Sequence, residues 1–92
     1  MDDVIEKLAD YVFALSEALV NDGNANDRPI LTKRLAACAE MFAQLYRSKS
    51  VASIQSLLQQ EEHGHGWSFI AGPSGELIAK KWVVFAKAAG IE

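Results

Sequence analysis

The sequence predicts a mainly α-helical protein, a small bundle of about four helices that opens with an antiparallel helical hairpin over residues 2–48. Apolar residues recur at steps of three and four in two segments, which places each set along one side of a helix. The polar stretch 21–26 between the segments is short enough for the second helix to fold back beside the first. The two sets are Ile5, Leu8, Val12, Leu15 and Leu19, and Leu31, Leu35, Cys38, Phe42 and Leu45.

The composition indicates what class of protein this is. The 92 residues are 50% hydrophobic and 23% charged, which predicts one folded helical domain over residues 1–92. Charged residues break every apolar run well before the roughly 20 residues that cross a bilayer, and the first residues are acidic rather than basic. The single cysteine, Cys38, excludes an internal disulfide and fits a reducing compartment. We therefore expect a soluble, cytoplasmic protein that makes no membrane contact.

Local signals mark the ends of the two hairpin helices. Asp2 and Asp3 place negative charge at the positive end of the first helix dipole. Asp27 is expected to be the N-cap of the second helix, with Pro29 in its first turn, where the missing amide hydrogen costs nothing. The second helix should run to about Ser48. These signals agree with the apolar periodicity on where both helices lie.

A third, shorter helix is expected to follow at once. Ser50 is a suitable N-cap, and Gly64 is a suitable stop. The residues that this helix would bury are Val51, Ile54, Leu57 and Leu58.

The last third of the chain fits two interpretations. Residues 76–89 form a good helical pattern that ends at Gly90, a residue suited to the left-handed conformation after a helix. The side of that helix facing the core would carry Ile78, Trp82, Phe85 and Ala89. Residues 72–75 (Gly-Pro-Ser-Gly) also suit a tight turn, so a short β-hairpin near residues 67–79 is the alternative. The poor alternation after Gly75 favours the helix.

Charge is divided unevenly along the chain. Residues 1–27 hold seven acids and one base, whereas residues 28–60 hold five bases and one acid. This division stabilises neighbouring helices through weak exposed pairs, or it offers an acidic and a basic face to different partners. On the second interpretation Glu6, Asp10 and Glu17 are candidate contacts of the first helix with a basic partner protein.

Motifs for catalysis or for cofactor binding are lacking. His63 and His65 follow Glu61 and Glu62, but this cluster offers only two imidazole nitrogens, and no other Cys or His cluster would complete a zinc site. Residues 72–75 lack the Gly-Lys-Ser/Thr of a phosphate-binding loop. We therefore expect no enzymatic activity, no cofactor and no metal, although the sequence leaves a metal at the two histidines open.

Nucleic-acid binding is the alternative function. The basic link 47–50 joins the second and third helices roughly as in a helix-turn-helix, with Lys33, Arg34, Arg47 and Lys49 as candidate phosphate contacts. The link lacks the usual glycine, the third helix has no basic residue, and the chain is acidic overall, which weakens attraction to phosphate.

The main functional expectation is protein binding without chemistry. Trp67 and Phe69 are aromatic residues of the type that anchors interfaces, and they are candidate contacts if they are exposed rather than buried. A regulator, adaptor or inhibitor of a protein complex, as small bacterial or phage chains often are, is the form we expect. The apolar stripes could also pair across a two-fold axis, so a homodimer is open.

Overall fold

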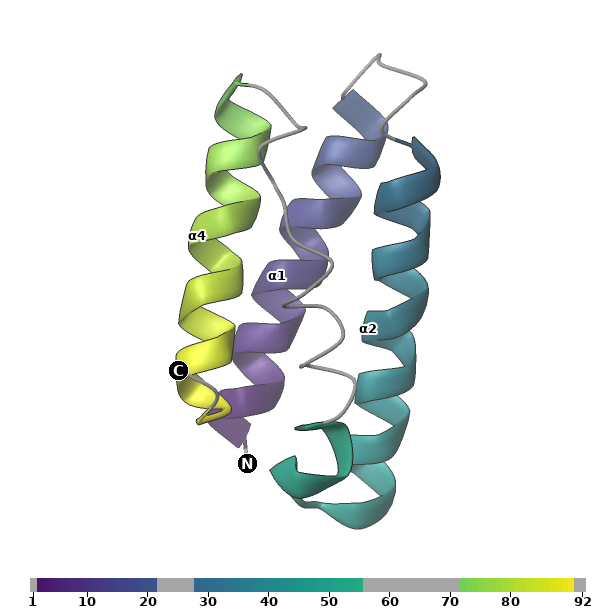
Figure 1. Cartoon of the computed structure of the whole chain (residues 1–92), viewed down its shortest axis with the longest axis vertical. Coiled ribbons are helices and arrows are strands. Elements are labelled where there is room, and N and C mark those ends of the chain that lie inside the picture. Colours follow the sequence, from purple (N-terminus) through teal and green to yellow (C-terminus); the bar gives the residue numbers. More distant parts are fainter. Residues whose placement is uncertain (1, 22–27, 56–71, 91–92) are drawn as a thin grey trace.

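Helix α1 lies between two other helices in the computed structural model of the chain (Figure 1). The structure describes residues 2–21, 28–55 and 72–90. Its elements are α1 (Asp2–Asn21), α2 (Arg28–Ser48), a 3₁₀ turn η1 (Val51–Ile54) and α4 (Gly72–Ala88). Both α2 and α4 pack against α1, and η1 packs against α2. The described residues therefore form three helices and one short turn, rather than the four helices expected.

The helical hairpin predicted over residues 2–48 is confirmed. Helices α1 and α2 run in opposite directions side by side (Figure 1). Pro29 lies in the first turn of α2, and α2 ends at Ser48, as the sequence indicated. The expected N-cap, Asp27, lies outside the described residues. The apolar periodicity was sufficient to predict these two helices because each of them spans about 20 residues.

The core side of α1 is rotated relative to the predicted stripe. Leu8 and Leu15 are fully buried as expected, but Ile5, Val12 and Leu19 are only partly buried. The remaining buried positions of α1 are Val4, Tyr11, Ala14 and Ala18. A helix with one neighbour needs one apolar stripe, whereas α1 has a neighbour on each side. The contact with α4 brings Tyr11 and the small residues beside it into the core.

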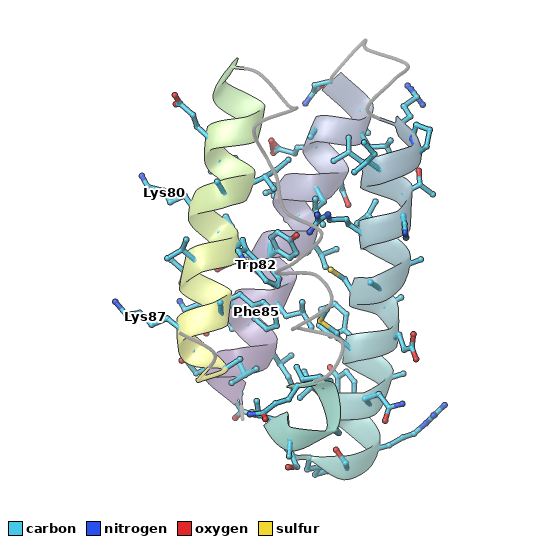
Figure 2. All side chains as sticks on the ribbon, in the orientation of Figure 1. Lys80, Trp82, Phe85 and Lys87 are labelled. Atoms are coloured by element: carbon cyan, nitrogen blue, oxygen red, sulfur yellow. The ribbon has the colours of Figure 1, made fainter. Side chains whose placement is uncertain are left out.

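Three aromatic rings join α1 to α4. The ring centroids of Tyr11 and Trp82 are 5.2 Å apart, those of Trp82 and Phe85 are 5.8 Å apart, and those of Tyr11 and Phe85 are 6.3 Å apart. Figure 2 shows Trp82 and Phe85 pointing from α4 toward α1. Separations in this range are typical of favourable aromatic packing. This cluster fixes which sides of α1 and α4 face each other, and so also which sides face outward.

The helix predicted from Ser50 to Gly64 begins, in its described part, as a 3₁₀ turn that is followed by Gln55 in the helical conformation. Residues Val51–Ile54 form a single 3₁₀ turn, and residues 56–64 lie outside the described ranges. The predicted N-cap is confirmed, because Ser50 Oγ accepts a hydrogen bond of 3.2 Å from the backbone amide of Ala52. The Ser53 hydroxyl donates a hydrogen bond of 2.7 Å to the Ser50 carbonyl, which supports the tight turn. Of the residues expected to be buried here, Ile54 is fully buried and Val51 partly buried.

Helix α2 is followed by a left-handed residue, Lys49, rather than by a glycine. Lys49 has φ of 54°, and its amide donates a hydrogen bond of 2.8 Å to the Leu45 carbonyl. This is the arrangement in which glycine is usual, because a Cβ atom is unfavourable at positive φ. The link between α2 and η1 therefore makes its sharp turn without the glycine that a helix-turn-helix commonly uses.

We predict that Lys49→Gly stabilises the protein. Relief of the left-handed strain should raise the free energy of unfolding by about 0.5–1 kcal/mol and the melting temperature by about 2–8 °C. Calorimetry or thermal unfolding followed by circular dichroism measures this change. Lys49→Ala is the matched control, since it removes the same charge and keeps the strain. An equal gain in both variants would contradict the explanation.

The β-hairpin near residues 67–79 is also contradicted. Residues 76–79, its second strand, lie within α4, and residues 67–71 lie outside the described ranges. Helix α4 begins at Gly72, four residues before the helical pattern was expected to start. Pro73 is compatible with this start, because proline is tolerated in the first turn of a helix. At the other end Gly90 has φ of 76°, so its predicted left-handed conformation is confirmed.

Candidate protein-binding surface

The outward side of α1 combines carboxylates with large apolar residues. Five residues at steps of three and four lie on this side, opposite the buried positions of the helix. We call them the α1 face. They are Glu6, Asp10, Phe13, Glu17 and Val20.

Two apolar side chains of the α1 face are strongly exposed. Phe13 is 65% exposed and Val20 is 78% exposed. The two residues are seven positions apart, which places them about 10.5 Å apart along the helix axis. A single exposed apolar residue is ordinary, but Phe13 and Val20 lie on the same side of the helix with Glu17 between them, and we call these two residues the apolar strip. Burial of this strip against a partner would be favourable.

The carboxylates of the α1 face are the three residues that the sequence analysis named as candidate contacts. Glu6 and Glu17 are exposed, and Asp10 is partly exposed. Within the described part of the chain, none of the three forms an ion pair with another residue. Their charge is therefore available to a partner, and it borders the apolar strip of Phe13 and Val20.

Phe13 and Val20 are candidate contact residues that the sequence analysis did not name. Their spacing of seven, together with three acids at steps of three and four, would have placed them on the charged side of the helix. The position of Phe13 and Val20 on the charged side could therefore have been found from the sequence. Their degree of exposure could not, because it depends on which sides of α1 its two neighbours cover.

The outward side of helix α4 carries two lysines, Lys80 and Lys87, and one acid, Glu76, near its start. Lys80 and Lys87 point away from α1, in the direction opposite to Trp82 and Phe85 (Figure 2). Two apolar residues accompany the lysines, since Leu77 is 39% exposed and Val84 is 41% exposed. We call these four residues the α4 face. Neither lysine forms an ion pair with another described residue.

The predicted aromatic contacts, Trp67 and Phe69, lie outside the described residues. The same holds for His63 and His65. Within the ranges that the structure does describe, no group of three or more His, Cys, Asp and Glu side chains could hold a metal ion. The described surface therefore offers contact chemistry, on α1 and α4, rather than a ligand cluster.

The four basic residues proposed for nucleic acid do not form one surface. Lys33, Arg47 and Lys49 are exposed, but Arg34 is only 5% exposed and offers little surface to a phosphate. Lys33 and Arg47 lie about 21 Å apart along the axis of α2, and Glu40 lies on the same side of the helix between them. A carboxylate between two lone cations opposes the approach of a phosphate backbone. The observed placement thus gives the nucleic-acid alternative little support.

Comparisons of this chain with protein-family models, with curated proteins and with solved structures found no match. Among the helices of the described ranges, none has the length and apolar character that a membrane span requires. The function of the α1 and α4 faces is therefore inferred from the charge and exposure of their residues.

Proposed function

We propose that this chain is a non-enzymatic binding protein that acts through protein–protein contact, as a regulator, adaptor or inhibitor. The observation that carries the proposal is the strip of Phe13 and Val20 on the α1 face. Interfaces combine aromatic anchors with a charged surround, which is the composition of this face. Water leaves the apolar strip on binding, and the carboxylates beside it select the partner.

The chemistry of the α1 face defines the partner that it fits. A helix that binds beside α1 needs apolar residues at steps of three and four to cover Phe13 and Val20. It also needs lysine or arginine at the positions opposite Asp10 and Glu17, since like charges there would be repelled. We therefore propose a basic amphipathic helix as the partner element.

The proposal predicts that Phe13→Ser combined with Val20→Ser abolishes partner capture and leaves the fold intact. Both side chains are exposed, so circular dichroism should show unchanged helix content. The measurement is affinity capture from host extract with and without nuclease, followed by identification of the retained proteins by mass. Proteins held by the wild-type chain in the presence of nuclease should be lost from the double variant.

Tyr46→Ser on α2 is the matched control. Tyr46 is 64% exposed, close to the value for Phe13, but it lies on a different helix. Capture should be unchanged in this variant. Retention of the same proteins by the Phe13/Val20 variant would overturn the proposal, and loss of all captured material on nuclease treatment would favour nucleic-acid binding instead.

A further inference from the structure

The α4 face has the chemistry that we propose for a partner of the α1 face. Lys80 and Lys87 supply the positive charges, and Leu77 and Val84 supply the exposed apolar side chains. These residues follow one another at steps of three, four and three. From Asp10 onward the α1 face follows the same steps, so the two faces have the same spacing.

The two faces match in one register when their helices run antiparallel. Asp10 and Glu17 of the α1 face then each lie level with a lysine of α4, and Phe13 and Val20 each lie level with an apolar residue. The pairs along α1 are Asp10 with Lys87, Phe13 with Val84, Glu17 with Lys80, and Val20 with Leu77. A parallel arrangement that takes the same four positions in order would place Asp10 level with Leu77 and Phe13 level with Lys80, so these pairs would be lost.

These pairs cannot form within one copy of the chain. Helices α1 and α4 of one protomer contact each other through the cluster of Tyr11, Trp82 and Phe85. The α1 face lies opposite the buried positions of its helix, and the lysines of the α4 face point away from α1. The two faces can therefore meet only between two molecules.

We propose that the partner of the α1 face is a second copy of this chain, which binds through its α4 face in the antiparallel register described above. This inference rests on the proposed function of the α1 face. Because the two faces differ, the contact is heterologous, and a bound pair retains a free α4 face on one copy and a free α1 face on the other. Association should therefore rise with concentration and continue into a closed ring or an open chain.

A charge exchange tests the inference. One variant carries Asp10→Lys and Glu17→Lys, and the other carries Lys80→Glu and Lys87→Glu. Sedimentation of the purified wild-type chain should show self-association, and each variant alone should raise the apparent dissociation constant by about tenfold or more. An equimolar mixture of the two variants should restore association, because each altered face then meets an oppositely charged one.

Lys33→Glu combined with Arg47→Glu is the control for net charge. This variant also reverses two charges, but on α2, and its association should equal that of the wild type. Circular dichroism of every variant verifies the fold. A wild-type chain that stays monomeric up to about 1 mM, or a mixture no stronger than its components, would overturn the inference.

The inference and the proposed function can fail separately. A monomeric wild-type chain that still captures another protein through Phe13 and Val20 would refute self-association and leave the proposed function in place. If the charge exchange controls self-association but Phe13→Ser with Val20→Ser has no effect on either measurement, the proposed role of the apolar strip is wrong.

Discussion

Phe85→Ala is expected to lower the free energy of unfolding by about 3–5 kcal/mol, among the largest effects of any single substitution in this chain. Phe85 is fully buried, and its ring packs against Tyr11 of α1 and Trp82 of its own helix. Its removal leaves a cavity at the contact that joins α4 to α1. A domain of 92 residues has a total stability of roughly 5–14 kcal/mol, so this one change removes a large share.

The measurement is chemical or thermal unfolding at low protein concentration, where self-association does not contribute. The melting temperature should fall by at least about 12 °C. Val84→Ala is the matched control, because the neighbouring Val84 is 41% exposed and its truncation should change stability by no more than about 0.5 kcal/mol. Similar losses in both variants would show that Phe85 is not the contact between the two helices.

The helical hairpin and the core side of α4 could be predicted from the sequence. Long apolar periodicity specifies a helix and its buried side when other signals agree with it. In α4 the predicted side was correct, since Ile78, Phe85 and Ala89 are buried and Trp82 is partly buried. Residue type alone also predicted two local features correctly. Ser50 is the N-cap of η1, and Gly90 adopts the left-handed conformation.

The errors arose where local sequence permits two structures. Residues 72–75 suit both a tight turn and the first turn of a helix, and the periodic pattern that follows them decides for the helix. The burial of Tyr11 and Ala18 could not be predicted, because the sequence does not say which helix lies in the middle. The exposed state of Phe13 and Val20 depends on the same missing information.

The central position of α1 explains why its outward side is the candidate binding surface. Two neighbours, α2 and α4, cover the apolar residues of α1 that face them, and one narrow side remains open. Phe13 and Val20 on that open side contribute nothing to the core of the protomer, so polar residues there would serve folding as well. The contact outside the protomer that we propose would account for their presence.

The second large effect is expected at the turn after α2. Ile54 is the fully buried residue of the four-residue turn η1, which packs against α2, and Val51 of the same turn is partly buried. Ile54→Ala should lower the free energy of unfolding by about 2–5 kcal/mol, and Ile54→Val by about 0.5–1.5 kcal/mol, because the cost follows the cavity volume. Denaturant unfolding of the two variants beside the wild type measures this series.

The size of the loss at Ile54 distinguishes a core position from a loosely attached turn. If η1 separates from α2 without global unfolding, both variants will lose only a few tenths of a kcal/mol, and hydrogen exchange at Ala52 will be fast in the wild type. If η1 is part of the cooperative unit, the graded loss will appear, and the Ala52 amide, which donates to Ser50 Oγ, will exchange slowly. The full burial of Ile54 predicts the second outcome.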